Sequence, residues 1–336
     1  MDKHDESPST IKLIASVLGL SHSTVSRALN GRPGVNNATR SRIEIEAARQ
    51  GYVANRAAQM LKQRSSSVMG LVVPNIRNRF YASVARAMAD AASKQARQVM
   101  LFTTDDDPRR ESQSIRSLAG ARARAVVIAA TAHPEPETLE LLNNLRTIQL
   151  LRRNAEIPGP VVEVDDALGI ELATTALLQA GHRRVAYIGA LAELSTGRNR
   201  LMGYRRSLDR AGVVFDDQLV ALRSPDVEDG VSALGLVLSS HPTGLVVGSP
   251  ELAEGVVLEL VRRRVDVPRQ LSLVCYGDRD WQEMVYGGLT SVVLPEDELA
   301  RTALALLLAP AESVAADVLL LPKLLERASV APPNVL

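Results

Sequence analysis

The chain has 336 residues, more than one hydrophobic core usually organises, so we expect two or three compact units. Hydrophobic residues make up 46% and charged residues 23%, a globular composition that excludes a largely disordered chain. The net charge is only +1, but residues 1–64 carry ten Lys/Arg against five Asp/Glu, and the remainder carries 29 against 33. This positive segment indicates an anionic partner such as DNA, unless it is merely a solvated surface.

The sequence also predicts the compartment. Its first ten residues are polar and lack the apolar stretch of a secretory signal, and no apolar run reaches the roughly 18 residues that a membrane span needs. We therefore expect a cytoplasmic protein without membrane contact. Cys275 is the only cysteine, so no internal disulfide is possible, and no set of His and Cys residues has the spacing of a metal site.

Residues 10–30 predict two short helices joined by a tight turn. Apolar residues recur at helical spacing on both sides of the sequence Gly19-Leu20-Ser21. Gly19 suits the positive φ of such a turn, and Ser21 can cap the second helix. A third helix is predicted over residues 37–50, ending before Gly51.

A long, position-specific pattern runs through the same region. It consists of Ile14-Ala15, Gly19-Leu20-Ser21, Thr24-Val25-Ser26-Arg27, Leu29-Asn30, Val35, Thr39-Arg40 and Gly51-Tyr52. This pattern resembles the lactose-repressor (LacI/GalR) family, which implies an N-terminal all-α helix-turn-helix DNA-binding domain over residues 9–54. The alternative is a generic three-helix cap with a polar exterior.

The resemblance implies that the second helix enters the major groove of DNA. Arg27 is the expected specificity determinant, because a guanidinium can bond two acceptors of one guanine. His22 either reads a base or contacts only the backbone. The candidate DNA-binding residues of this domain either read bases or hold phosphates: Ser21, His22, Ser23, Thr24, Ser26, Arg27, Asn30 and Thr39.

Residues 55–67 resemble the hinge helix and linker of the family. Fewer than ten residues cannot hold a helix alone in water, so the hinge is expected to fold on DNA beside the hinge of a second subunit. The resemblance implies that Asn55 caps this helix, that Ala58 allows close approach, and that Leu61 wedges between base pairs in the minor groove. Leu61 is otherwise an ordinary linker leucine. Ala54 replaces the proline that is usual in the family.

Beyond residue 67, about ten strand-like apolar runs alternate with helical runs, which predicts parallel sheets covered on both faces. The order resembles the α/β type I periplasmic-binding-protein fold of the same family, with two parallel-sheet lobes. This implies an effector-binding and dimerisation domain over residues 68–332. The expected lobes comprise residues 68–165 with 295–321, and residues 166–294 with 322–332; the chain would cross between them near Asp165, Leu294 and Leu321.

Ligands of this fold bind between the lobes, at the carboxyl ends of the strands. Arg200 matches an arginine with which the family grips its ligand. Asp165 or Asp166 either accepts hydrogen bonds from ligand hydroxyls or caps the following helix, and Phe80 either stacks on a ring or fills the core. The candidate effector-binding residues are Asn78, Phe80, Asp105, Asp165, Arg198, Arg200, Ser249 and Asp278.

Departures from the family pattern bear on the effector. Ser249-Pro250 stands where members often have Asn-Asp, and Gly277 replaces the first of two aspartates. The loss of these polar groups argues against a standard neutral sugar. Four arginines favour an anionic metabolite such as a sugar acid or sugar phosphate, unless the first two lie on the surface: Arg77, Arg79, Arg198 and Arg200.

The sequence thus predicts a DNA-binding transcription regulator, a repressor, that binds a palindromic operator as a homodimer and responds to a sugar or anionic metabolite. The alternatives are a solute-binding protein with the same body fold and an α/β enzyme with a regulatory N-terminal cap. No nucleophile–base set, phosphate-binding loop or metal motif is present, so no enzymatic activity and no cofactor are predicted. His182, in Gly-His-Arg-Arg, is expected to stabilise a turn.

Overall fold

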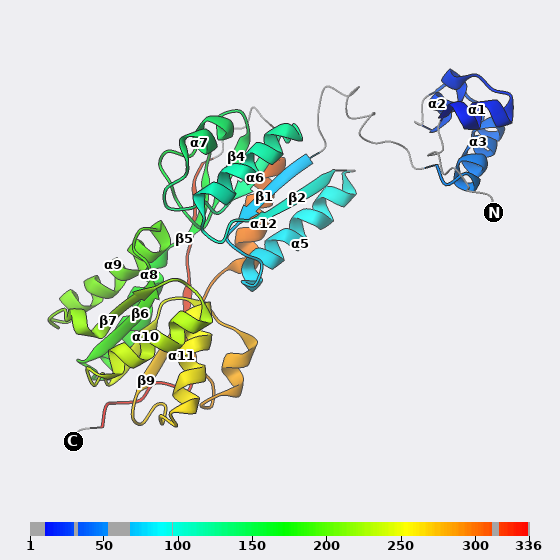
Figure 1. Cartoon of the computed structure of the whole chain (residues 1–336). Helices are drawn as coiled ribbons and strands as arrows, with labels where there is room; N and C mark the ends of the chain where they lie inside the picture. Colours follow the sequence, from blue (N-terminus) through cyan, green and yellow to red (C-terminus); the bar gives the residue numbers. More distant parts are fainter. Residues whose placement is uncertain (1–10, 30–32, 53–67, 96, 311–315, 335–336) are drawn as a thin grey trace, which may run out of the picture. The chain divides into compact units, whose positions relative to one another are not determined.

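The computed structural model describes residues 11–29, 33–52, 68–95, 97–310 and 316–334. The chain divides into two compact units, Met1–Ser65 and Ser66–Leu336 (Figure 1). None of the helices in the described ranges has the length and apolar character needed to cross a membrane.

The smaller unit consists of three short helices around one core. They are α1 (Ile11–Leu18), α2 (His22–Leu29) and α3 (Asn37–Arg49). Ile14, Val25 and Ile43, one from each helix, are completely buried against one another. The predicted helical spacing places these residues on the inner faces, and burial of three branched side chains stabilises a unit that is too small for a larger core.

The turn between α1 and α2 has the predicted chemistry. Gly19 has a φ of +64°, in the region that favours glycine, and the Ser21 Oγ accepts a hydrogen bond from the Thr24 amide at 3.1 Å. Asn36 caps α3 in the same way by accepting from the Thr39 amide at 2.8 Å, and Gly51 follows α3 with a φ of +62°.

The larger unit contains two six-stranded sheets, each in its own lobe. The N-lobe sheet has the order β11-β5-β4-β3-β1-β2, and the C-lobe sheet has the order β12-β10-β9-β8-β6-β7. The N-lobe strands are β1 (Val68–Val73), β2 (Gln98–Thr103), β3 (Ala125–Ile128), β4 (Arg146–Leu150), β5 (Val161–Val164) and β11 (Val318–Leu320). The C-lobe strands are β6 (Val185–Ala190), β7 (Val220–Arg223), β8 (Gly244–Val247), β9 (Ser272–Tyr276), β10 (Thr290–Val293) and β12 (Lys323–Leu325).

One strand departs from the expected parallel pairing. The short strand β12, which the sequence pattern did not predict, pairs antiparallel with β10, whereas the other strand pairs of both sheets are parallel. The cause lies in the connection, because only Leu321 and Pro322 separate β11 from β12. β11 runs parallel to the other N-lobe strands and ends between the lobes, so β12 enters the C-lobe sheet from the carboxyl ends of its strands and runs opposite to them.

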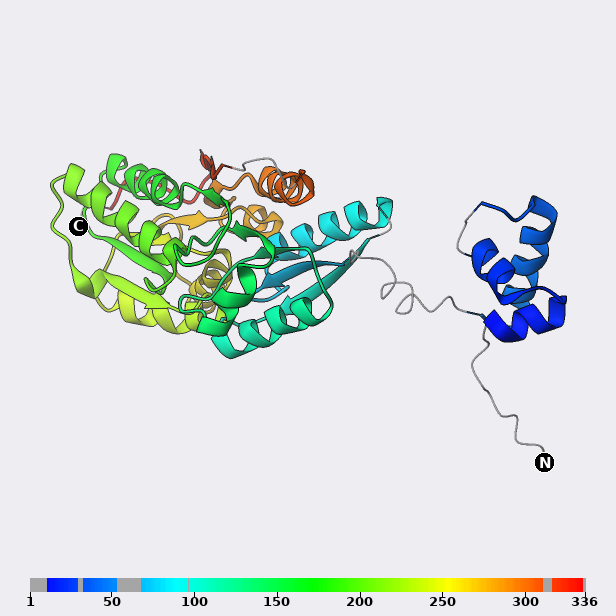
Figure 2. The same cartoon turned by 90° about the horizontal axis from the view of Figure 1, so that it is seen from above.

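Helices cover both faces of each sheet. The N-lobe helices are α5 (Arg79–Lys94), α6 (Pro108–Gly120), α7 (Pro136–Leu142) and α12 (Glu296–Leu308); the C-lobe helices are α8 (Asp166–Gln179), α9 (Ser195–Arg210), α10 (Val227–Leu238) and α11 (Pro250–Arg262). In Figure 2, α5 and α6 lie on opposite sides of β1 and β2. Alternate residues of the C-lobe strands pack into two cores, one beneath α8 and α9 and the other beneath α10 and α11.

The chain passes between the lobes three times. It leaves the N-lobe sheet after β5 and continues into α8, returns after β10 through α12, and passes from β11 to β12 near its end. These passages lie at Asp165, at Leu294 with Pro295, and at Leu321 with Pro322. The strand ends that precede the first two passages therefore face the region between the two sheets.

Candidate nucleic-acid interface and ligand pocket

One face of α2 is exposed and polar. Val25 and Ala28 are buried, whereas His22, Ser23 and Arg27 are exposed, and Ser26 is half-buried. Because α2 packs only one side against α1 and α3, its outer side is available to a partner. Within 11–29 and 33–52, the acidic residues are Glu44 and Glu46, and both lie on α3 rather than α2.

Two further elements border this face. The Ser21 Oγ lies 2.8 Å from the hydroxyls of both Ser23 and Thr24, so three hydroxyl groups cluster where α2 begins. Thr39 is half-buried in the first turn of α3, and Arg40 donates to the Ala28 carbonyl at 3.2 Å, which ties α3 to α2. Clustered hydroxyls and a helix N-terminus are groups that hold phosphate oxygens.

Four of the predicted DNA-binding residues lie outside the described residues. They are Asn30, Asn55, Ala58 and Leu61. Their roles remain predictions from the sequence.

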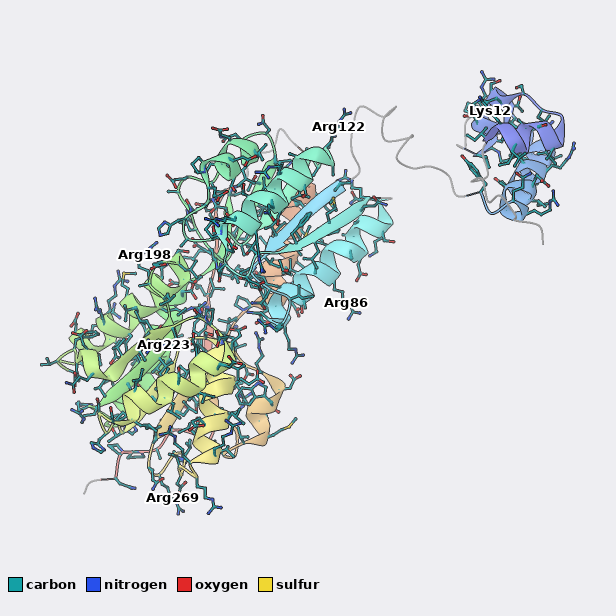
Figure 3. All side chains as sticks on the ribbon, in the orientation of Figure 1. Lys12, Arg86, Arg122, Arg198, Arg223 and Arg269 are labelled. Carbon is teal, nitrogen blue, oxygen red and sulfur yellow. The ribbon has the colours of Figure 1, made fainter. Side chains whose placement is uncertain are left out.

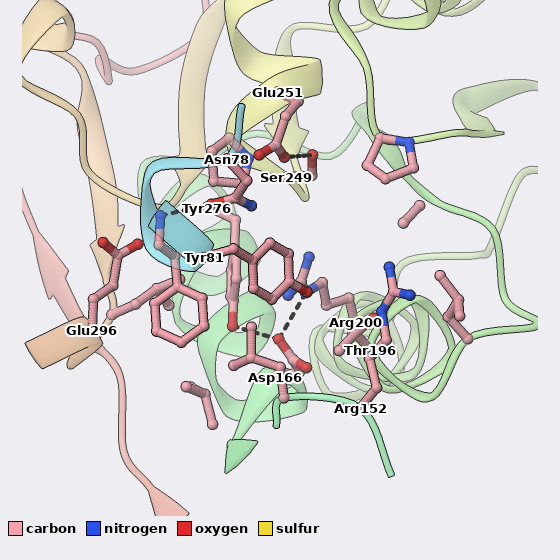
Figure 4. A pocket seen from close by; sticks show the side chains of 18 of the residues that line it. Asn78, Tyr81, Arg152, Asp166, Thr196, Arg200, Ser249, Glu251, Tyr276 and Glu296 are labelled. Atoms are coloured by element: carbon pink, nitrogen blue, oxygen red, sulfur yellow. Dashed lines mark hydrogen bonds and ion pairs between the residues drawn. The ribbon is translucent and has the colours of Figure 1, made fainter. Parts of the chain in front are cut away.

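The larger unit contains a pocket at the carboxyl ends of its strands, with lining residues from both lobes (Figure 4). It encloses about 700 Å³ that no atom occupies, part of it open to solvent. Asn78, Tyr81 and Arg152 belong to the N-lobe, and Arg200 and Tyr276 belong to the C-lobe. Charged, polar and aromatic side chains of both lobes thus converge at this pocket, as in a small-molecule site.

Arg200 is held at the floor of the pocket by three contacts. Its Nε donates to the Asp166 Oδ1 at 2.7 Å, its Nη1 donates to the Gly248 carbonyl at 2.9 Å, and its Cζ lies 4.2 Å from the centre of the Tyr276 ring. The Tyr276 hydroxyl also donates to the Asp166 Oδ1, at 2.5 Å. Burial raises the pKa of Asp166, and the charge of Arg200 opposes that shift.

Arg152 forms a similar buried pair on the N-lobe side. Its guanidinium contacts the Asp106 carboxylate through two nitrogens, and its Nη1 donates to the Ala130 carbonyl at 3.1 Å. Only 8% of its side chain is exposed. Since Arg152 lies two residues after the end of β4, the pairing of β4 with β3 brings its side chain close to the end of β3.

A third pair joins the two lobes. The Arg279 Nη1 donates to the Glu296 Oε1 at 2.8 Å, with 10% and 24% of the two side chains exposed. Arg279 follows the C-lobe strand β9, and Glu296 begins α12, which packs on the N-lobe. The pocket arginines Arg152, Arg200 and Arg279 therefore each have a carboxylate partner.

Comparisons with known proteins identify both units. Residues 10–55 match the model of bacterial regulatory proteins of the lacI family, and residues 66–309 match the model of periplasmic binding proteins and the sugar-binding domain of the LacI family. The second match alone covers well over half of the chain. The chain belongs to the LacI family. It is a transcription regulator with a DNA-binding helix-turn-helix and a two-lobed effector domain.

Relatives in the LacI family match along nearly the whole chain. Catabolite control protein A of Priestia megaterium is 27% identical over 304 residues, covering 89% of this chain and 91% of that protein. The regulator GalR of Escherichia coli is 28% identical, with 90% of each chain covered. The ribose operon repressor of Bacillus subtilis is 28% identical, covering 89% of this chain and 90% of the repressor.

Solved LacI-family structures share this fold. The lac repressor dimer bound to operator and the anti-inducer ONPF has a TM-score of 0.81 at 20% identity, covering 97% of this chain and all of that chain. The complex of the transcriptional regulator CelR with cellobiose has a TM-score of 0.71 at 25% identity, covering 96% of this chain and all of that chain.

Four of the effector-binding residues expected from the LacI resemblance line the pocket: Asn78, Phe80, Arg200 and Ser249. Of these, Asn78 and Ser249 also cap helices. The Asn78 Oδ1 accepts from the Phe80 amide at 2.9 Å, and the Ser249 Oγ accepts from the Leu252 amide at 3.3 Å. Phe80 is buried in the N-lobe core and also lines the pocket, so it both fills the core and borders the site.

The other four expected residues do not line this pocket. Asp105 pairs with Arg110 at the surface, Asp165 caps α8 through the Leu168 amide at 2.9 Å, and Asp278 pairs with Arg327 at 2.7 Å. Arg198 is exposed and borders an adjoining pocket that shares Arg152 and Leu194 with this one. For the aspartates the physical reason is the same, because each carboxylate is directed to a nearby amide or cation.

Sequence reasoning missed several lining residues. They are Tyr81, Arg152, Thr196, Glu251, Tyr276, Arg279 and Glu296, and it left Asp166 as an alternative to Asp165. The signal that could have found Arg152 and Tyr276 was their position at the carboxyl ends of predicted strands. Glu296 gave no such signal, because it begins a helix. It reaches the pocket only because the chain passes from β10 in the C-lobe to α12 on the N-lobe at this point.

Proposed function

We propose that this LacI-family regulator is a repressor that binds a palindromic operator as a homodimer, in the cytoplasm, and that a neutral, hydroxyl-rich sugar is its effector. The operator role rests on the exposed polar face of α2, which includes Arg27 in the last turn. Two-fold symmetry of a dimer would account for a palindromic site. The proposal assigns the chain no enzymatic activity.

We infer a neutral effector from the balance of charges in the pocket. Arg152 pairs with Asp106, Arg200 pairs with Asp166, and Arg279 pairs with Glu296. A further carboxylate, Glu251, lines the pocket and contacts only the Ser249 hydroxyl among the interactions of the described residues. Each of these three arginines has a carboxylate partner, so a phosphate or carboxylate would find no unpaired positive charge among the residues that line this pocket.

The expectation of an anionic metabolite relied on other arginines. Arg77 and Arg79 do not line the pocket, and Arg79 pairs with Asp280 at the surface. The groups that do line it suit hydroxyls instead. Carboxylates accept hydrogen bonds from hydroxyls, guanidinium groups donate them, and Phe80 and Tyr81 add aromatic surface that suits the C–H side of a sugar.

A thermal-shift screen of the full-length protein tests this proposal. The panel contains neutral mono- and disaccharides, sugar acids and sugar phosphates, each at several concentrations. A ligand at 100 times its Kd stabilises the folded state by about 2.7 kcal/mol, which is readily measured. We expect stabilisation by a neutral sugar, and we expect that sugar to change operator affinity. Stabilisation by a phosphorylated sugar alone would contradict the neutral effector.

The solute-binding alternative is disfavoured by one observation. Residues 10–55 match the regulatory model of the LacI family, and the three helices have a core of their own. A protein that only binds a solute does not require a helix-turn-helix unit. Selection of a consensus from random duplexes tests the point directly, since absence of any sequence preference at moderate salt would remove the operator role.

A further inference from the structure

The amino-terminal edge of the N-lobe sheet carries four exposed cations. Lys94 ends α5, Arg97 precedes β2, Arg122 follows α6, and Arg124 precedes β3. We call these four residues the basic edge. Figure 3 shows Arg122 extending from the end of α6.

The sheet register brings the basic edge around the start of β1. Val68 pairs with Gln98 on one side, and Met69 pairs with Ala125 on the other. Arg97 and Arg124 are the residues directly before those two partners, and the Arg124 amide donates to the Val68 carbonyl at 3.3 Å. The cations therefore flank the point where the chain enters the larger unit from residues 53–67.

Among the described residues, no ion pair neutralises the positive charge of the basic edge. In the described part of the chain, none of its four residues has a carboxylate oxygen within 4.0 Å. Asp90 lies one turn before Lys94 but forms no ion pair with it. Like charges gathered on one edge repel each other, so the arrangement is unfavourable for the isolated protein.

The corresponding edge of the C-lobe is different. Arg183 and Arg184, which precede β6, donate to the carbonyls of Leu178 and Ser240, and two acidic residues, Asp216 and Asp217, precede β7. Those cations satisfy backbone groups of their own lobe. Lys94 and Arg122 also lie near helix C-termini, where a cation is favourable, but Arg97 and Arg124 lie in loops before strands and gain nothing from a helix.

The sequence excludes the linker as the partner of the basic edge. Residues 53–67 contain Arg56, Lys62 and Arg64 and no acidic residue, so they add positive charge. The linker also limits the distance to DNA. From Leu61 to Val68 the chain spans at most about 25 Å when fully extended, since each residue covers no more than about 3.6 Å. A chain whose Leu61 lies in the operator therefore keeps the basic edge close to the duplex.

We propose that the basic edge binds the phosphate backbone of the DNA that flanks the operator centre, as a second and sequence-independent contact beside the helix-turn-helix. The inference rests on the proposed operator binding. Phosphate contacts add affinity without reading bases. In a plot of log K against log salt concentration, the loss of each contact with duplex DNA makes the slope less steep by about 0.9.

The test compares two variants of the full-length protein that lose the same charge. The edge variant carries Lys94→Gln, Arg97→Gln, Arg122→Asn and Arg124→Gln; Asn is chosen at 122 because the φ there is +53°. The control variant carries Arg86→Gln, Arg109→Gln, Arg269→Gln and Arg301→Gln, at exposed positions away from this edge. Melting temperature and effector binding check that both variants fold.

Binding is measured against salt on an operator duplex with long flanks. We expect the edge variant to bind at least tenfold more weakly at about 0.1 M salt, with a salt slope less steep by two or more and an unchanged base preference. The control variant should stay within twofold of the unaltered protein. The double variant Lys94→Gln/Arg97→Gln should give an intermediate loss.

Two outcomes separate this inference from the function on which it rests. If the unaltered protein binds no operator, the proposed function fails. If the unaltered protein binds its operator and the edge variant matches the control in affinity and slope, the basic-edge contact alone is overturned. A change in base preference in the edge variant would also overturn it, because backbone contacts carry no sequence information.

Discussion

Arg279 and Glu296 form an ion pair of 2.8 Å that joins the two lobes at the wall of the pocket. Arg279 belongs to the C-lobe and Glu296 begins the N-lobe helix α12, so the contact exists only while the lobes are close together. The pair therefore couples the separation of the lobes to the surface that a ligand would touch.

Replacing Glu296 with Gln should favour an open arrangement of the lobes. Arg279 would remain largely buried without its charged partner, at a cost on the order of 2 kcal/mol, between the values for surface and buried pairs. Small-angle scattering without effector should show a larger radius of gyration. Asp280→Asn is the control, since the Arg79–Asp280 pair also joins the lobes but is exposed. Equal scattering from both variants would contradict the prediction.

Replacing Arg200 with Lys should weaken effector binding by about 10- to 100-fold, or roughly 1.4–2.8 kcal/mol. Lysine keeps the charge but cannot reproduce both the Asp166 contact and the Gly248 contact of the guanidinium. The loss is measured as a smaller ligand-induced rise in melting temperature. Arg198→Lys, on the same helix but outside the pocket, should behave like the unaltered protein. Undiminished binding in R200K would remove Arg200 from the site.

Replacing Arg27 with Ala should lower operator affinity by about 1–3 kcal/mol and relax the preference at one base pair, because the side chain is exposed on the polar face of α2. Binding to operators with single base changes measures both effects. Lys12→Ala, on α1, is the control (Figure 3) and should weaken all sequences slightly and equally. An Arg27 variant that lost affinity equally on every sequence would show a backbone contact instead.

Replacing Leu61 with Ala should weaken operator binding and reduce bending of the duplex. The residue lies outside the described residues, so this prediction rests on the family resemblance and on the cost of unstacking that an apolar wedge offsets. Gel mobility of duplexes with the operator at different positions measures the bend. Val53→Ala provides a control of similar size change. Unchanged affinity and bending in L61A would make Leu61 an ordinary linker residue.

Because of His182, the free energy of unfolding of the larger unit should fall in mild acid. It is 1% exposed, and its ring nitrogens lie 2.9 Å from the Thr243 hydroxyl and 2.9 Å from the Ala331 carbonyl. Burial lowers its pKa below the usual value near 6.5. Below that pH the unfolded chain binds a proton that the folded chain does not, so the free energy of unfolding falls as pH falls, by at most about 1.4 kcal/mol per pH unit.

Denaturant unfolding between pH 7 and pH 5 measures this contribution. His182→Gln should show a shallower decline than the unaltered protein, and His133→Gln, at an exposed position, should keep the original slope. A His182 variant with the original pH dependence would mean that another group is responsible. The side-chain contacts of His182 are with Thr243 and Ala331, both distant in sequence, so its turn-stabilising role stays a prediction.

Local spacing in the sequence was enough to predict the three N-terminal helices, their Gly19 turn and Ser21 cap, and the alternation of strands and helices in the larger unit. These features depend on contacts between residues close along the chain, which propensity and periodicity report directly. Only the tertiary structure decided between Asp165 and Asp166, since neighbouring side chains at a helix start point in different directions. Only the tertiary structure also showed which residues form the ion pairs Arg152–Asp106, Arg200–Asp166 and Arg279–Glu296. These partners are far apart in sequence and meet only when the strand ends and the lobes come together.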